Sequence, residues 1–232
     1  MPSFDLICLA NSYKHNRRCV AGLRTDGGGW VRPVSDREQG ELDYHQSRYP
    51  DRSEPRVLDV IRVGLSEPRP LPHHPENWLI DGSAWEPVER PASVEYAAVV
   101  AGGVSRDQSL FGDSGNRVPE ERFRSHAARE SLALVQPGHI AWHREPDSQR
   151  GRNPARVRFH IHQAGYDLPL TDPAHRQLLA MLPPGTHPAS DLYIPQDRKL
   201  LLTISLSEPF SGFFYKLVAA VVVLPQAWDP FF

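Results

Sequence analysis

Proline and glycine are spread through the whole of this chain, and they limit the length of any helix that it can form. The sequence has 23 prolines and 16 glycines in 232 residues. Proline removes a backbone donor and clashes with the preceding helical turn, and glycine loses more conformational freedom than other residues when a helix forms. We therefore expect a mainly β protein, with short helices and long irregular connections between short strands.

Apolar and alternating runs in the first half predict one group of strands. The expected strands are residues 4–9, 19–24, 30–34, 57–64 and 94–100. An Asp-Gly-Gly-Gly turn at residues 26–29 favours a hairpin between the second and third of them. Closely spaced prolines predict an irregular connection over residues 67–85, and a short polar helix is expected within residues 120–130.

The second half repeats this organisation. The expected strands are residues 132–136, 139–143, 156–162, 200–206 and 214–224. An aspartate start signal and a following Pro-Pro pair predict a helix over residues 172–182. Each half has about 110 residues, a size suited to a small β-barrel. We predict two domains, residues 1–118 and residues 119–232.

Charge is separated along the chain, although the formal net charge is only −2. Residues 11–34 hold five basic side chains and one acid, a net charge of +4. Residues 144–158 hold five arginines and two acids, a net charge of +3, which leaves −9 for the remainder. Local positive charge of this kind is typical of a protein with an anionic partner.

The basic residues of segment 11–34 predict a nucleic-acid site. Lys14, Arg17 and Arg18 are expected in a loop between two strands, where flexible cations reach phosphates, and Arg24 follows on the second strand. The alternative is a solvated loop with no ligand.

Trp30 and Arg32 are two positions apart on an expected strand, so their side chains share one face. A tryptophan on that face would stack on a base, and the arginine would contact phosphate. The alternative places Trp30 in the core of the barrel and Arg32 in an ion pair with Asp5 or Glu41.

Three basic residues of the second half join the predicted nucleic-acid site. Arg156 and Arg158 are expected on the outward face of strand 156–162, together with His160 and His162. If this face and segment 11–34 border one groove, a strand of DNA or RNA would cross both barrels, with an affinity that falls steeply with salt. Lys216 interrupts an apolar strand, so its ammonium contacts either a bound anion or a group of the protein itself.

Histidines offer an enzymatic alternative. His160 and His162 share a strand face, and His143 together with a carboxylate would complete a metal site. Phosphate-loop, nucleophile-elbow, zinc-protease and dinucleotide motifs are all missing from the sequence. We therefore expect no catalytic residue, no metal and no cofactor, and binding in preference to catalysis.

A polar turn, His-Pro-Glu-Asn-Trp, ends the proline-rich connection. Its Glu76 and Asn77 either line a ligand pocket or anchor the loop, and the sequence favours the anchor. The two cysteines, Cys8 and Cys19, lie in apolar segments without metal-ligand spacing, and we expect both to be reduced thiols.

The apolar run at residues 217–225 is too short to cross a bilayer, and the N-terminal segment has no basic region before its apolar residues. We expect a soluble cytoplasmic protein with no membrane partner.

Several stretches, taken in order, resemble one known family. They are ICLANSYKHNRRCVAG, GGWVRPVS, GEL, LDV, HHPENW, YDLPLTDP and SLSEPFSGFFYKLVAAVV. In these stretches the chain is similar to a bacterial family of proteins with a dual OB domain, over nearly its whole length. The resemblance implies two OB-like barrels and, by analogy with other OB-folds, a nucleic-acid ligand.

We predict a protein that binds nucleic acid, DNA or RNA in single-stranded form, through a basic loop and an aromatic strand face. Two alternatives stay open at this point. One is a metal-dependent enzyme of nucleotide or nucleic-acid chemistry that uses the histidines. The other is a module that recognises a protein or a nucleotide and acts with a separate effector protein.

Overall fold

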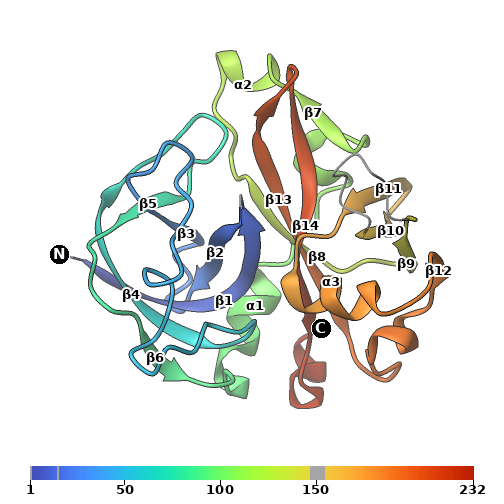
Figure 1. Cartoon of the computed structure of the whole chain (residues 1–232), viewed down its shortest axis with the longest axis horizontal. Coiled ribbons are helices and arrows are strands. Elements are labelled where there is room, and N and C mark those ends of the chain that lie inside the picture. The colour runs from blue at the N-terminus through green and yellow to red at the C-terminus, as the bar shows by residue number, and fades with distance from the viewer. Residues whose placement is uncertain (1, 15, 147–154) are drawn as a thin grey trace. The chain divides into compact units, whose positions relative to one another are not determined.

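The structure, a computed structural model, describes residues 2–14, 16–146 and 155–232 (Figure 1). The chain divides into two compact units. Unit 1 consists of Met1–Gly103, Phe123–Ser131 and Pro230–Phe232, and unit 2 consists of Val104–Arg122 and Leu132–Asp229. The chain thus passes from one unit to the other several times, whereas the boundary that we predict after residue 118 divides the chain once. That boundary stays a prediction.

Unit 1 is a closed five-stranded barrel with one added strand. Its strands are β1 (Ser3–Lys14), β2 (Arg17–Arg24), β3 (Trp30–Val34), β4 (Val60–Pro68), β5 (Asn77–Ile80) and β6 (Glu86–Glu89). They pair in the order β1-β2-β3-β5-β4, and β4 also pairs with β1, which closes the barrel (Figure 1). β3 and β5 run parallel, and the other pairs are antiparallel.

The core of unit 1 is built from inward residues of these strands, of the loop between β3 and β4 and of the loop between β5 and β6. Its buried members are Leu6, Cys8, Val20, Val31, Leu42, Tyr49, Ile61, Val63, Leu65 and Trp85. Gly22 of β2 lets β1 approach closely, because a Cβ at this position would lie 2.4 Å from the backbone oxygen of Ile7.

Unit 2 is a half-barrel of two four-stranded sheets. Its strands are β7 (Arg117–Pro119), β8 (Leu132–Val135), β9 (Ile140–Arg144), β10 (Ala155–Ile161), β11 (Ala164–Pro169), β12 (Gly185–His187), β13 (Leu200–Phe210) and β14 (Phe213–Val223). One sheet has the order β11-β10-β9-β12, and the other has the order β7-β14-β13-β8.

Unit 2 repeats part of the strand order of unit 1. β9, β10 and β11 pair in antiparallel succession as β1, β2 and β3 do. After β11, Leu170 forms a parallel bridge with Val218 of β14, which corresponds to the parallel pairing of β3 with β5. In unit 1 the pairing of β4 with β1 closes the barrel. Within the described residues no corresponding pairing joins β13 to β9, so the barrel of unit 2 stays open between these two strands.

The helices are short, as the proline content predicts. They are η1 (Val94–Tyr96), α1 (Ala97–Gly102), η2 (Leu110–Gly112), α2 (Arg122–Ser125), α3 (Pro173–Ala180), η3 (Ala189–Leu192) and η4 (Gln226–Phe231). Helix α3 starts where the sequence predicts, because the buried carboxylate of Asp172 accepts a hydrogen bond of 3.1 Å from the backbone N of His175. The same carboxylate accepts 2.9 Å from the backbone N of Val221, which ties α3 to β14.

Three predicted elements are wrong in part. Residues 94–100 form η1 and the start of α1 instead of a strand, and Ala97 and Ala98, at the start of α1, have a high helix propensity. The connection at residues 67–85 contains β5, which gains its hydrogen bonds from β3 and β4. The helix expected in residues 120–130 is reduced to the single turn of α2.

Cys8 and Cys19 are free thiols, as predicted. Cys8 lies opposite Gly22 in the β1–β2 ladder, whereas Cys19 lies opposite Ser12. Burial, with a smaller contribution from Asp59, raises the pKa of the Cys8 thiol to about 12, so it is unreactive at neutral pH. In the described part of the chain, no helix is long and apolar enough to cross a membrane.

Candidate nucleic-acid interface

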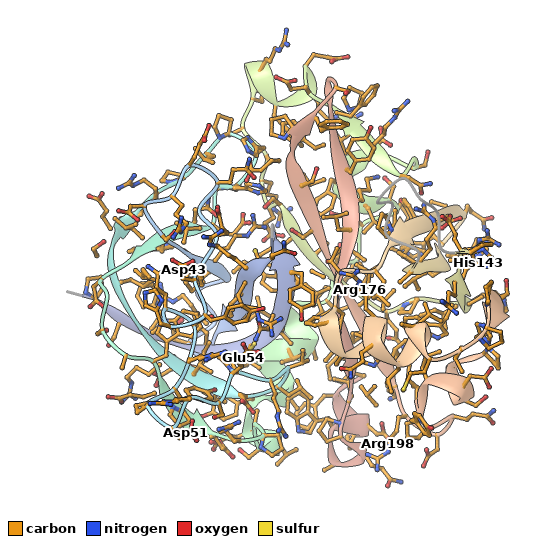
Figure 2. All side chains as sticks on the ribbon, viewed as in Figure 1. Asp43, Asp51, Glu54, His143, Arg176 and Arg198 are labelled. Atoms are coloured by element: carbon orange, nitrogen blue, oxygen red, sulfur yellow. The ribbon has the colours of Figure 1, made fainter. Side chains whose placement is uncertain are left out.

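Four arginines of unit 1 share two carboxylates. Arg17 Nε lies 2.5 Å from Asp43, and Arg37 Nη2 lies 2.6 Å from the other oxygen of the same carboxylate. Arg18 binds Glu54, and Arg48 Nη2 lies 3.8 Å from it. Asp43 and Glu54 are both labelled in Figure 2. Each group of two arginines and one acid keeps a net charge of +1.

These ion pairs hold the loop between β3 and β4 against the end of the β1–β2 hairpin. Arg18 and Leu42 exchange backbone hydrogen bonds of 2.9 Å, which places Asp43 beside Arg17. Hydrogen bonds from Arg17, and next from Arg37, hold the pKa of the Asp43 carboxyl below its usual range, so this acid stays ionised at neutral pH.

Two tyrosine rings lie over these arginines at the surface. The guanidinium carbon of Arg18 lies 4.6 Å from the ring centroid of Tyr13 and 5.3 Å from that of Tyr44. Arg48 lies 5.1 Å from the ring of Tyr44, so rings and guanidinium groups alternate. Tyr13 is 38% exposed and Tyr44 is 37% exposed. Both rings therefore keep surface that a ligand can contact.

We call this surface the Tyr–Arg face. It consists of Tyr13, Arg17, Arg18, Arg37, Asp43, Tyr44, Arg48 and Glu54. Two of the residues predicted from the sequence, Arg17 and Arg18, belong to it, but they begin β2 and do not lie in the loop that we expected, because the strands pair almost to the end of the hairpin. Lys14 ends β1, and its side chain lies outside the described part of the structure.

The positive charge of segment 11–34 is largely balanced within unit 1. Residues 36–54 hold three arginines and six acids, a net charge of −3, and this segment supplies both shared carboxylates. Charges that are separated along the sequence are therefore brought together by the fold. The Tyr–Arg face offers exposed rings with a small positive surplus, and not the strongly basic loop that the sequence predicts.

Arg24 lies away from the Tyr–Arg face, at the other end of the β1–β2 ladder. It forms an ion pair with Asp26, and its guanidinium carbon lies 4.0 Å from the ring centroid of Phe4. An open hollow of about 460 Å³ lies here, lined by Ser3, Phe4, Asp5, Arg24, Thr25, Asp26 and Arg62. Both arginines of this hollow are paired with aspartates.

Trp30 and Arg32 are buried, so they do not form the exposed platform that we expected. Trp30 is 8% exposed and Arg32 is 3% exposed. Every residue of β3 is buried, because the strand is covered on both faces. This matches the core alternative for Trp30. The partner of Arg32 is neither Asp5 nor Glu41; it is Glu76, at 2.9 Å.

Arg32 is the centre of a buried polar network in unit 1. Its Nη1 donates to Nδ1 of His74 over 2.7 Å, and its Nη2 donates to Oγ of Ser131 over 2.9 Å. The Ser131 hydroxyl donates in turn to Glu76. The His-Pro-Glu-Asn-Trp turn is thus anchored to β3 and to the returning segment Phe123–Ser131, which matches the loop-anchor alternative.

Ser131, His74 and Glu76 are the residue types of a hydrolytic triad, but their arrangement differs from that of a triad. In a triad the histidine lies between the nucleophile and the carboxylate. Here Ser131 binds Glu76 directly, and the His74 nitrogen that faces Ser131 at 2.8 Å already accepts from Arg32. The Nδ1 lone pair of His74 is therefore occupied by the guanidinium of Arg32, and Ser131 is fully buried. The network stabilises the fold and does not activate a nucleophile.

In unit 2, Arg156 and Arg158 share one carboxylate. Their Nε atoms lie 2.6 Å and 3.1 Å from the two oxygens of Asp167 on β11. Burial alone would raise the pKa of Asp167, but the hydrogen bonds from Arg156 and Arg158 outweigh it and hold the pKa below its usual range. Residues 147–154 of the predicted basic cluster, including Arg150 and Arg152, lie outside the described residues.

Lys216 is fully buried in unit 2. Its Nζ donates 2.6 Å hydrogen bonds to the backbone oxygens of Asp113 and Gly115, and it lies 5.1 Å from the ring centroid of Tyr166. Burial lowers the pKa of its ammonium to about 8, against the opposing influence of Asp113. These contacts match the alternative in which Lys216 contacts groups of the protein itself.

The histidines of the metal alternative do not come together. His143 is on β9, His160 is on β10 and His162 follows β10. Among the described residues, these three do not form a group whose ligand atoms lie within 4.8 Å of one another. His143 instead contacts Thr186 of β12 over 3.1 Å.

The sequence reasoning missed Tyr13, Arg37, Tyr44 and Arg48. Their signal is weak, because Tyr13 lies at the edge of the basic segment, and Tyr44 and Arg48 belong to an acid-rich loop with no strand pattern. These parts of the chain come together in the fold, through the backbone bridge of Arg18 with Leu42 and the ion pairs beside it.

A model of known protein families matches residues 4–221, and a search of curated proteins found no match. Among solved structures, a murine DNA-binding protein bound to double-stranded DNA is matched at 9% identity with a TM-score of 0.28, over 97% of this chain and 99% of that chain. A TM-score this low does not establish a shared fold. The family match spans both units, and the chain belongs to the family of the dual OB-containing domain.

Proposed function

We propose that this chain binds single-stranded nucleic acid through the Tyr–Arg face of unit 1. The observation that carries the proposal is the pair of exposed rings, Tyr13 and Tyr44, that both pack on the guanidinium of Arg18. A base stacked on an aromatic side chain contributes about 1–3 kcal/mol, and stacking tolerates any base sequence. A guanidinium packed against each ring fixes its orientation before the ligand arrives.

The place of this surface in the barrel supports the proposal. OB-folds bind oligonucleotides through their second and third strands and through neighbouring loops, including the loop between the first two strands. Tyr13 lies at the end of β1, and Arg17 and Arg18 begin β2, so the Tyr–Arg face borders the equivalent loop. Lys14, the last residue of β1, borders the same loop and stays in the proposed site.

Bases, more than phosphates, supply the affinity in this proposal. Arg17, Arg37 and Arg48 have side chains that are between 35% and 39% exposed, and each also contacts a carboxylate. The surplus charge suits one or two phosphates. Each phosphate contact to a single strand contributes about −0.7 to the slope of log K against log salt, so we expect a slope of about −1.

The test is a fluorescence-anisotropy titration of labelled oligothymidylate and oligouridylate at about 50 mM and about 200 mM salt. We expect binding at both salt concentrations, with at most a tenfold difference in affinity. Absence of binding at the lower salt concentration for both oligonucleotides would overturn the proposal.

A further inference from the structure

The outward face of the sheet β12-β9-β10-β11 carries a regular array of polar side chains. Residues directly opposite each other in antiparallel strands share a face, and the register aligns Thr186, His143 and Arg156 in one row. A second row aligns Ala141, Arg158 and Asp167, and a third pairs His160 with Gly165. The alternate residues of β10 point inward and are buried.

Among the described residues of this face, the charges of the arginines and carboxylates cancel when the histidines are neutral. Asp167 accepts from both arginines, and Glu145, the residue after β9, lies 3.8 Å from Arg156 Nε. Two arginines are therefore balanced by two carboxylates. Because histidine is the side chain that ordinarily titrates between pH 5 and 8, protonation of His143 and His160 would add two positive charges to this described set.

Both imidazoles lie where an added ligand can contact them. His160 is exposed, and a Cβ at Gly165 would lie 3.3 Å from its Nε2, so the ring extends over the bare backbone of β11. His143 is half-buried at the edge formed with β12, where its Nδ1 contacts Thr186 Oγ1 over 3.1 Å. Figure 2 labels His143 on β9.

The charged neighbours of each imidazole come from its own strand and from the two adjacent strands. His160 has Arg158 on β10, Asp167 on β11 and His139, whose backbone oxygen accepts from His160, before β9. His143 has Arg156 on β10, the neutral Thr186 on β12 and Glu145, which directly follows β9. Each imidazole thus has one arginine and one acid nearby. An added anion would make these surroundings more negative and would favour the protonated imidazole.

We propose that this face is a second nucleic-acid surface that binds the phosphodiester backbone of a single strand when His143 and His160 are protonated. The proposal rests on the function proposed above and adds a dependence on pH to it. Arg156 and Arg158 supply donors beyond those used by Asp167, since each guanidinium has five. Protonated imidazoles supply the missing positive charge.

The size of the effect follows from counterion release. Two added contacts to a single strand make the slope of log K against log salt more negative by about 1.4, which corresponds to roughly a twentyfold gain in affinity at about 0.1 M salt. Binding and protonation are linked, so the strand must also favour the charged imidazoles to the same degree. The titration curves of both histidines should therefore move to higher pH when the strand is bound.

The test is NMR of the full chain labelled with ¹³C in histidine, titrated from pH 8 to pH 5.5 with and without oligothymidylate. The signals are assigned with His143→Gln and His160→Gln, and thymine itself does not titrate in this range. We expect the oligonucleotide to move the titration curves of both histidines upward. If the oligonucleotide binds and both curves stay in place, this inference fails and the function proposed for unit 1 stands.

Affinity gives the second readout. The double variant His143→Gln/His160→Gln should bind as the unaltered chain does at pH 8 and lose the roughly twentyfold gain at pH 5.5. The control is His126→Gln, which removes an exposed histidine of unit 1. An equal gain at pH 5.5 in the double variant would overturn the inference, and absence of binding at every pH would overturn both proposals.

Discussion

Arg32 Nη2 lies 2.9 Å from Oγ of Ser131, a residue 99 positions further along the chain. The bond connects β3 to the segment Phe123–Ser131, which returns to unit 1 after the chain has entered unit 2. Since Arg32 also binds Glu76 and His74, one buried guanidinium joins three distant parts of the chain. The arginine that we predicted as a phosphate ligand instead stabilises the unit.

Replacing Arg32 with Met should destabilise unit 1 strongly. The change leaves the buried carboxylate of Glu76 without its countercharge, which lowers the free energy of unfolding by about 3–5 kcal/mol. The measurement is denaturant unfolding at pH 7. The control is Arg62→Met, which removes a more exposed pair with Asp5 and should lower the same quantity by less than about 1 kcal/mol. Equal effects of the two changes would contradict the account.

Trp30→Ala should also act on stability. Trp30 is 8% exposed, and truncating a buried tryptophan lowers the free energy of unfolding by about 3–5 kcal/mol. The measurement is the same denaturant curve, followed by an oligonucleotide titration at a temperature where the variant is folded. A variant of unaltered stability that has lost its affinity would identify Trp30 as a base platform instead.

Asp43→Asn should strengthen nucleic-acid binding. The carboxylate of Asp43 binds Arg17 and Arg37, so its removal leaves both guanidinium groups available to phosphates. We expect higher affinity and a slope of log K against log salt that is more negative by about 0.7 for each additional phosphate that the arginines bind. Anisotropy titrations at several salt concentrations measure both. A loss of affinity without a loss of stability would show that Asp43 itself contributes to the site.

Lys216 should make stability depend on pH above 8. Its pKa is about 8 in the folded chain, against 10.5 for an unperturbed lysine, so between these values the unfolded chain binds more protons. Stability therefore rises with pH through this window. The unfolding free energy of the unaltered chain, minus that of Lys216→Met, should increase from pH 8 to pH 10.5. A difference that stays constant would mean that the buried ammonium titrates as an exposed one does.

Local patterns predict much of the fold. Residues 30–34 form β3 with the predicted bounds, and the alternation in 156–162 correctly places Val157, Phe159 and Ile161 in the core. The helical turn of α1 was missed because its apolar run of alanine and valine has no period that separates helix from strand. β5 was missed because its strand character comes from β3 and β4 and not from its own residues.

The candidate site was less predictable, because it depends on contacts between distant residues. The sequence locates the arginines of segment 11–34, but only the fold shows that Asp43 and Glu54 neutralise part of their charge. It also cannot show that Tyr44 meets Arg18, since this contact follows from the backbone bridge of Arg18 with Leu42. Arg32 looks exposed by alternation, yet β3 is covered on both faces.

The stacking claim is tested most directly by Tyr13→Ala/Tyr44→Ala in an oligothymidylate titration. The double variant removes both rings and no charge, so we predict at least about a fivefold loss of affinity per ring with an unaltered salt slope. The control is Tyr193→Ala, which removes a tyrosine of unit 2 that is 79% exposed and should leave affinity unaltered. A double variant that is folded and binds as tightly as the unaltered chain would contradict the account.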